Sequence, residues 1–217
     1  MGDTERRILS KVKWGNSFKN YEEVQRAFDD PDDAFGFRHY DKSSNVHKYP
    51  APRTMFDLLI QIIHSVSGSN IIDFACGTGL SGFQFVDLGF TVDGIDLSEE
   101  MLKVARARGY RYTWQKNLVT DDVNGVKGYD LAICIGALGE YIPPEIVIPK
   151  MVATLEQTAL LCFTSEEEHT DIRAVEQQLR GFGFLVAHKS VKPGYIDEEL
   201  GEDHYYVIAT RSRSFEN

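Results

Sequence analysis

The sequence predicts an α/β fold in which helices cover both faces of a mostly parallel sheet. Three observations predict this class. Segments with strand-like patterns alternate with amphipathic helical segments along most of the chain. The stretches YDLAICIGAL (129–138) and TALLCFT (158–164) are nearly continuous apolar runs, which is typical of strands buried on both faces. The chain then closes with two strand-like segments, FLVAHKSV and HYYVIATR, expected to pair antiparallel.

The first expected elements follow from local patterns. Apolar residues at helical spacing predict an amphipathic helix over RTMFDLLIQIIHSV (53–66), after the stiff Pro50 and Pro52. A strand is expected at 71–74, followed by a glycine turn and a helix ending at Gly89. The next strand is expected at 90–96.

The second half of the chain continues the alternation. Ser98 is the expected N-cap of a helix to about Arg108, and YTWQKN (112–117) is a plausible third strand. PPEIVIPKMVATL predicts a helix that Pro149 must begin, break or kink. DIRAVEQQLRGFGF predicts a last helix before the closing strands. Residues 1–50 show the least regular pattern, and we expect them to form a lid or cap on a domain at 51–217.

Composition limits the classes of function. The net charge of −10 disfavours a nucleic acid partner, because phosphate contacts need clustered Lys and Arg. No apolar run approaches the roughly 20 residues of a membrane helix, and the first residues lack the apolar core of a signal peptide, so we expect no membrane partner and a cytoplasmic location. The three cysteines form no Cys-x-x-Cys pair, which argues against a disulfide framework or a metal site.

The stretch IIDFACGTGLSG (71–82) indicates a ligand-binding turn. Gly77, Gly79 and Gly82 have the G-x-G-x-x-G spacing, which alone is a weak signal. The turn nevertheless lies between a predicted strand and a predicted helix, and Asp96 ends the next strand, where an acid commonly accepts hydrogen bonds from a ribose. A dinucleotide and S-adenosylmethionine both fit. Asp73 favours the second, because its charge would repel a pyrophosphate and attract a ligand with an amino group.

The same residues resemble a known family. IIDFACGTGLSG resembles the first signature of class I S-adenosylmethionine-dependent methyltransferases, VDGIDLSEEML (92–102) resembles the second, and YDLAICIGALGEYIP (129–143) is similar to the strand-four region. The resemblance covers about residues 50–211. It implies a Rossmann-like fold with a seven-stranded, mostly parallel sheet and an antiparallel last strand. More narrowly, YPAPRTMFDLL and GALGE are similar to the methyltransferase-like proteins named for the Williams–Beuren chromosomal region. This narrower resemblance does not define the methyl acceptor.

Carried over position by position, the resemblance implies a set of donor-binding residues. The turn residues Asp73, Ala75, Gly77 and Gly79 match the positions that line the methionine part of the donor, and Cys76 is a small residue of the same turn. The other matched positions are Asp96 for the ribose, Leu97, Met101, Asn117 and Leu118 for the adenine, and Ile135 and Gly136 beside the sulfonium.

The acceptor side is less defined by the sequence. Glu140 and His169 follow predicted strands and are the candidate general bases, although each can equally be a solvated or capping residue. Arg53 is either a partner of the donor carboxylate or an exposed helix residue. Tyr40, Tyr49 and Tyr141 are candidate acceptor contacts, and the aromatic amino-terminal segment suggests an apolar or aromatic small-molecule acceptor.

Two other functions remain open at this point. A protein of the same fold could bind the donor without transferring a methyl group, or the turn could serve an NAD(P)-dependent oxidoreductase. The acceptor atom, the pathway and the oligomeric state do not follow from the sequence.

Overall fold

The computed structural model describes residues 20–33, 36–42, 49–63, 70–139, 142–193 and 203–211. Its centre is a seven-stranded sheet with the strand order β3-β2-β1-β4-β5-β7-β6. The strands are β1 (Asn70–Phe74), β2 (Thr91–Asp96), β3 (Thr113–Gln115), β4 (Tyr129–Leu138), β5 (Leu155–Glu166), β6 (Phe184–Pro193) and β7 (Asp203–Arg211). Strand β7 pairs antiparallel with both β5 and β6, while the pairs from β3 to β5 are parallel. The predicted fold class and the reversed last strand are confirmed.

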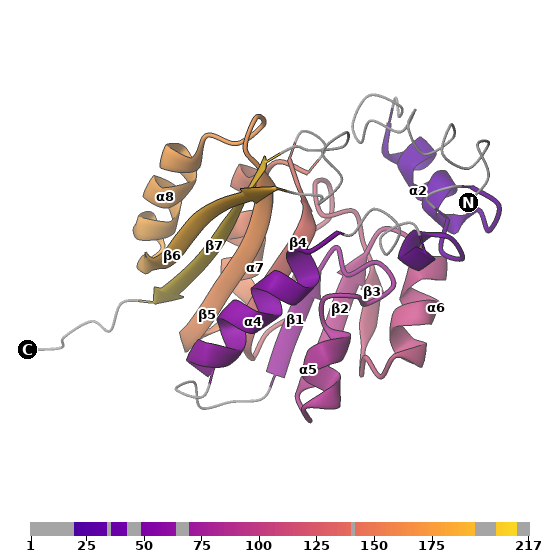
Figure 1. The fold of residues 1–217 in the computed structure, drawn as a ribbon, viewed down its shortest axis with the longest axis horizontal. Helices are drawn as coiled ribbons and strands as arrows, with labels where there is room; N and C mark the ends of the chain where they lie inside the picture. The colour runs from indigo at the N-terminus through magenta and orange to yellow at the C-terminus, as the bar shows by residue number, and fades with distance from the viewer. Residues whose placement is uncertain are drawn as a thin grey trace, which may run out of the picture.

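Helices cover both faces of the sheet (Figure 1). The helices α4 (Ala51–Ile63), α5 (Phe83–Asp87) and α6 (Glu99–Ala107) pack on one face, and α7 (Pro144–Thr154) and α8 (Ile172–Gly181) pack on the other. The strands between them carry buried apolar side chains toward each layer, including Ile72 and Leu161 on one face and Ile71 and Cys162 on the other. This two-sided burial explains the continuous apolar runs of the central strands.

Helix α2 (Tyr21–Asp29) is an element that the sequence analysis did not anticipate. Asn20 is its N-cap, and the Asn20 side chain accepts a hydrogen bond from the N–H of Glu23 at 3.0 Å. Figure 1 shows α2 above the sheet end on the side of α6, and α2 packs against α6. The described part of the amino-terminal segment is therefore more regular than expected.

Pro149 lies inside α7 without ending the helix. A proline cannot donate a backbone hydrogen bond, so the carbonyl of Glu145, one turn earlier, loses its helical partner. The side chain of Gln178 on α8 donates to that carbonyl at 3.0 Å. The neighbouring helix thus satisfies the acceptor that the proline leaves, which explains how one helix continues through Pro149.

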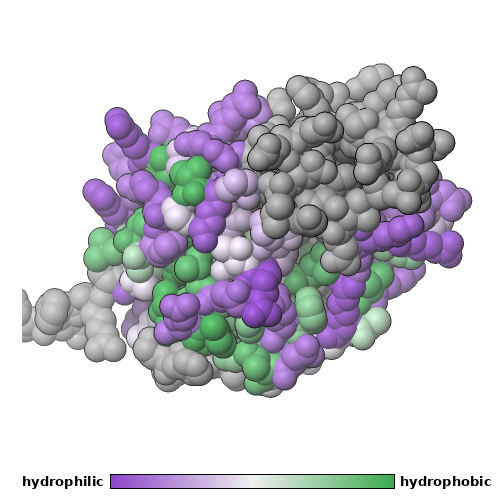
Figure 2. Space-filling view, viewed as in Figure 1, coloured by the Kyte–Doolittle hydropathy of each residue, from purple (hydrophilic) through white to green (hydrophobic). Residues whose placement is uncertain are grey.

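The described surface is largely polar. Figure 2 shows hydrophilic side chains spread over one face, with smaller apolar areas between them. The large exposed apolar side chains come from several separate elements: Leu88, Tyr112, Ile146, Phe182, Leu185 and Val191. Among the residues that the structure describes, no helix has the length and hydrophobicity to cross a bilayer.

Candidate functional site

A pocket lies at the carboxyl ends of the parallel strands, beneath α2. Strands β1 and β4 are neighbours there although β2 and β3 lie between them in sequence, so the chain order reverses at this point of the sheet. Open α/β sheets bind ligands at such a reversal. The lining residues come from the strand ends and from the amino-terminal segment: Tyr21, Val24, Phe28, Tyr40, Ala75, Gly77, Asp96, Leu97, Met101, Lys116, Asn117, Leu118, Ile135, Gly136, Ala137, Gly139, Ile142 and Glu166.

Asp96, the last residue of β2, is fixed by two backbone donors. Its carboxylate accepts hydrogen bonds from the N–H of Gly77 at 2.8 Å and from the N–H of Ser98 at 2.9 Å. Burial raises the pKa of Asp96, and these backbone hydrogen bonds oppose that rise. A carboxylate has about four acceptor positions, so two bonds to the backbone leave capacity for ribose hydroxyls. The Asp96 carboxylate thus links the end of β2 to the turn after β1 and is held in a fixed orientation.

The glycine turn has two sides with different neighbours. Of the residues that the structure describes, only Tyr40 would lie within van der Waals distance of a Cβ on Gly77, at 3.9 Å, so none of them fills the pocket side of this glycine. A Cβ on Gly79 would lie 2.8 Å from the ring of Tyr110, and one on Gly82 would overlap the Tyr110 hydroxyl. Two of the three motif glycines therefore make room for a tyrosine behind the turn.

Tyr110 is bound to Asp73 in the protein interior. The Tyr110 hydroxyl donates to the Asp73 carboxylate at 2.6 Å, and the two residues are 4% and 1% exposed. The pKa of Asp73 is raised to about 7: burial raises it most, the charge of Asp96 adds to the rise, and the Tyr110 hydrogen bond opposes it. Asp73 is thus not a lining residue of the pocket; its side chain supports the turn from behind.

Ala75 and Cys76 of the turn are constrained by the backbone and by burial, respectively. Ala75 has φ 53°, and among the described residues other than glycine it alone has a positive φ, a strained conformation for an L-residue. Cys76 is buried, and its sulfur lies where a Cβ on Gly94 would approach it to 2.7 Å. Burial raises the pKa of the Cys76 thiol well above its usual value, so the thiol stays protonated.

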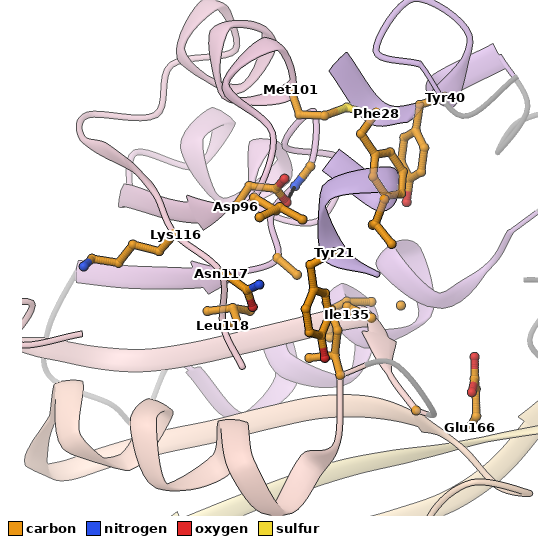
Figure 3. Close-up of a pocket in the computed structure, with 18 residues that line it drawn as sticks. Tyr21, Phe28, Tyr40, Asp96, Met101, Lys116, Asn117, Leu118, Ile135 and Glu166 are labelled. Carbon is orange, nitrogen blue, oxygen red and sulfur yellow. Dashed lines mark hydrogen bonds between the residues drawn. The ribbon is translucent and has the colours of Figure 1, made fainter. Parts of the chain in front are cut away.

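The pocket end beside Asp96 is apolar and well supported. Leu97, Met101 and Leu118 line the pocket together with Asn117, which lies beside Leu118 in Figure 3. The Asn117 side-chain oxygen accepts the N–H of Val119 at 2.9 Å, forming an Asx turn that orders the loop after β3. The ammonium of Lys150 donates to three carbonyls of the same loop, those of Leu118, Val119 and Asp121.

The other end of the pocket lies beyond Ile135 and Gly136 of β4. The register of β4 against β5 shifts between Cys134 and Leu138, so β4 bulges where it meets the pocket. Gly136 has φ 81°, and its N–H donates to the Thr164 hydroxyl at 2.7 Å. Beyond the bulge, the lining consists of Ala137, Gly139, Ile142 and Glu166.

The amino-terminal segment covers the pocket with aromatic side chains. Tyr21 and Phe28 come from α2, and the ring of Phe28 packs edge-on against Tyr40 at 6.2 Å between centroids. Burial, followed by the charge of Asp96, raises the pKa of Tyr40, so its hydroxyl stays protonated.

Two aspartates attach this cover to the domain below. Asp29, at the end of α2, accepts hydrogen bonds from the Ser98 hydroxyl at 2.5 Å and from the N–H of Glu100 at 3.3 Å, at the N-terminus of α6. Asp41 accepts from the Thr78 hydroxyl at 2.5 Å and forms an ion pair with Arg108. Ser98 also caps α6, as predicted, by accepting from the N–H of Met101.

The structure brings many of the proposed donor residues together. The pocket lining includes Ala75, Gly77, Asp96, Leu97, Met101, Asn117, Leu118, Ile135 and Gly136, and Tyr40 among the proposed acceptor contacts. Asp73, Cys76 and Gly79 are not lining residues: Asp73 and Gly79 contact Tyr110, and Cys76 is buried against Gly94.

Other proposed residues lie elsewhere. Arg53 lies outside the lining; its side chain is 71% exposed and pairs with Asp57 on the same helix. His169 is exposed in the turn after β5 and is not a lining residue. Tyr49 places its hydroxyl where a Cβ on Gly136 would overlap it, outside the lining. Glu140 and Tyr141 are outside the described residues.

Sequence reasoning missed several residues of the site. The contribution of α2 was detectable, because Asn20 is a favourable N-cap and Tyr21, Val24 and Phe28 follow at helical spacing. No local pattern marks Tyr110, since its place depends on glycines that are distant in sequence. Glu166 follows a predicted strand, as the candidate His169 does, but the sequence does not distinguish which of the two lines the pocket.

Comparisons with known proteins agree with this geometry. Residues 71–158 match the family model of a methyltransferase domain. The ubiquinone biosynthesis O-methyltransferase of Bordetella avium is 28% identical over 114 residues, which cover 48% of this chain and 46% of that protein. The glycine N-methyltransferase of Rattus norvegicus is 28% identical over 99 residues, covering 39% of this chain and 33% of that protein. The matched stretch is thus less than half of either relative.

Solved structures resemble the fold more completely. The magnesium protoporphyrin IX methyltransferase of Synechocystis PCC 6803, solved with bound S-adenosylmethionine, covers 94% of this chain and 97% of its own, with 17% identity and a TM-score of 0.60. The [4+2]-cyclase SpnF covers 74% of this chain and 81% of its own, with 15% identity and a TM-score of 0.57. The fold is therefore a Rossmann-like fold like that of these solved structures, and residues 71–158 match a methyltransferase domain.

Proposed function

We propose that the protein is an S-adenosylmethionine-dependent methyltransferase that acts on a small-molecule acceptor. The observation that carries this proposal is Asp96, which ends β2 beside an apolar pocket and is oriented by the N–H groups of Gly77 and Ser98. The match of residues 71–158 to a methyltransferase domain supports the same reaction.

The residues present fit the donor in kind. Asp96 would accept hydrogen bonds from the ribose hydroxyls, and Leu97, Met101 and Leu118 would pack against the adenine. Gly77 leaves the turn open on the pocket side, where the backbone can approach a ligand closely. When bound, the donor supplies a methyl group on a positively charged sulfur. The protein then mainly aligns an acceptor with that methyl carbon and keeps water away from it.

A small acceptor is supported by the covered pocket. Helix α2 and residues 36–42 overlie the site, and Asp29 and Asp41 hold them to α6 and the glycine turn. We therefore propose that this part of the segment 1–50 acts as a lid on the domain at 51–217. Together with the net charge of −10, a covered apolar pocket favours a small molecule over a nucleic acid. The narrower resemblance to the Williams–Beuren methyltransferase-like proteins stays a prediction.

Calorimetric titration with S-adenosylhomocysteine, with NADH in parallel, tests the donor site. We expect binding of the first ligand and a loss of at least about tenfold in Asp96→Asn, because the amide replaces the charged acceptor. Asp87→Asn, an exposed residue of α5 outside the pocket, is the matched control and should bind normally. Preferential binding of NADH would overturn the proposal and favour an oxidoreductase.

Donor binding without methyl transfer is the second candidate. The similarity in fold to a [4+2]-cyclase supports considering it, because that protein is named for a reaction other than methylation. Release of S-adenosylhomocysteine during incubation with S-adenosylmethionine and an acceptor panel separates the two. Donor binding with no release across the panel would favour the second candidate.

A further inference from the structure

The far end of the pocket contains a carboxylate whose place is prepared by a glycine. Glu166 is the last residue of β5, is half-buried, and lines the pocket beyond the β4 bulge. A Cβ on Gly139 would overlap the Oε2 atom of Glu166, so the carboxylate occupies the space that a side chain at position 139 would fill. Glu166 is therefore packed against the end of β4, where the lining continues through Ala137 and Ile142.

The charges around this pocket are unequal. Among the described residues that line it, Asp96 and Glu166 are acidic and Lys116 is basic. In Figure 3 the Lys116 side chain extends away from the other labelled residues, while Asp96 and Glu166 lie on opposite sides of Tyr21 and Ile135. An anionic acceptor in this pocket would therefore be repelled by two carboxylates, while the Lys116 ammonium is directed elsewhere.

The walls between the two carboxylates are apolar and aromatic. Tyr21 and Ile135 lie between the two carboxylates in Figure 3, and Val24 and Ile142 line the same pocket. A carboxylate bordered by apolar walls forms its strongest hydrogen bonds with a positively charged N–H donor. An aromatic ring such as that of Tyr21 also attracts a cation over its face. These are the groups that recognise an ammonium on an apolar body.

We infer that the acceptor is an amine with an apolar or aromatic body, and that Glu166 binds its ammonium group; this inference rests on the proposed function. In the reaction, the ammonium gives one proton to Glu166, and the freed nitrogen lone pair bonds to the methyl carbon. The carbon–sulfur bond breaks with its electron pair passing to sulfur, which becomes a neutral thioether. The product amine carries the new methyl group as an ammonium, and Glu166 returns its proton to water. Charge and atoms balance without a further reactant.

The test uses the full chain loaded with S-adenosylhomocysteine and three probes that share a phenyl body. These are 2-phenylethylamine, 2-phenylethanol and 3-phenylpropionate, titrated at pH 7. We expect the amine to bind about tenfold more tightly than the alcohol, and the carboxylate to bind most weakly. In Glu166→Gln the preference for the amine should fall to within about twofold, while the affinity for S-adenosylhomocysteine is unchanged. Glu168→Gln, an exposed carboxylate on the turn after β5 and outside the pocket, is the matched control and should keep the preference.

The outcomes separate this inference from the proposed function. An amine that binds no better than the alcohol, including no binding of either, overturns the inference, as does a preference that survives in Glu166→Gln. If the unmodified chain does not bind S-adenosylhomocysteine, the proposed function is overturned instead. Enzymatic release of S-adenosylhomocysteine with the amine, reduced in Glu166→Gln and not in Glu168→Gln, would support the proton-accepting role.

Discussion

The two ends of the pocket are constructed differently. At the donor end, residues of neighbouring strands and turns are hydrogen-bonded to one another, as Asp96 is to Gly77 and Tyr110 is to Asp73. At the acceptor end, the walls come from α2, the bulge of β4 and Glu166 at the end of β5. The donor end is thus held by hydrogen bonds among the strand ends and turns, whereas part of the acceptor end comes from α2, which lies outside the sheet. In a fold used for many reactions, this separation lets the acceptor vary while the donor site is retained.

Removal of Tyr110 should have the largest effect, because it tests whether the donor end depends on a residue behind the turn. Tyr110→Ala would leave a cavity beside Gly79 and Gly82, and we expect a loss of about 3–5 kcal/mol in the free energy of unfolding. Tyr110→Phe keeps the ring and removes the donor to Asp73, which should cost about 1–3 kcal/mol. Chemical denaturation measures both.

The neighbouring tyrosine provides the control for this prediction. Tyr112 is 59% exposed, and Tyr112→Phe should change the stability by less than about 0.5 kcal/mol. S-adenosylhomocysteine affinity, measured on the folded Tyr110→Phe protein, then shows whether the turn has moved. If Tyr110→Phe is as stable as the unmodified chain, the pair with Asp73 does not support the donor end.

The titration of Asp73, also at the donor end, should make the stability of the protein depend on pH. Because the folded pKa of Asp73 is about 7 and the unfolded value is near 4, the folded state holds more protons between these values. Stability from this group therefore falls as the pH rises from about 4 to about 7, and it is constant above that window. The loss is on the order of 1 kcal/mol per pH unit within the window.

Asp73→Asn isolates that contribution, since an amide does not titrate. Between pH 5 and pH 7, the unfolding free energy of the unmodified chain should fall relative to that of the variant. Asp96 also has a raised pKa, chiefly from its own burial, and that contribution is present in both proteins. A difference that is flat with pH would show that Asp73 titrates normally.

The same two ends differ in how far the sequence predicted them. Most strands and helices after residue 50, and the position of Asp96 at a strand end, could be predicted, because hydrophobic periodicity and glycine turns are local signals. Tyr110 could not, because it follows the end of α6 and meets Asp73, Gly79 and Gly82 only after folding. The interpretation of Asp73 as a charge facing the ligand illustrates the limit: the sequence placed it at the strand end but not the direction of its side chain.

At the acceptor end, even the existence of one element was missed. Residues 20–42 are acidic and aromatic, and this irregular composition masks the N-cap and the helical spacing of α2. Glu166 was near the predicted candidate His169, but only the overlap with position 139 distinguishes a packed carboxylate from an exposed side chain. Contacts between loops that are far apart in sequence decide this end, and such contacts leave little local pattern.

Loosening the lid should have the smallest effect on the donor end. Asp29→Ala removes the carboxylate that accepts from the Ser98 hydroxyl and the Glu100 N–H, while Ser98 still caps α6. We expect a cost of about 1 kcal/mol, confined to α2, and so a roughly fivefold faster hydrogen exchange of the α2 amides. S-adenosylhomocysteine affinity should change by less than about threefold, since Asp96 and the glycine turn stay in place.

Asp32→Ala, an exposed residue of the same segment, is the control and should leave both measurements unchanged. If Asp29→Ala weakens S-adenosylhomocysteine binding as strongly as Asp96→Asn does, α2 belongs to the donor site and the division between the two ends is wrong. If exchange in α2 does not change, the contact of Asp29 with α6 does not hold the lid. The expected pattern, faster exchange with nearly normal donor-site affinity, would show that the lid can open while the donor site remains formed.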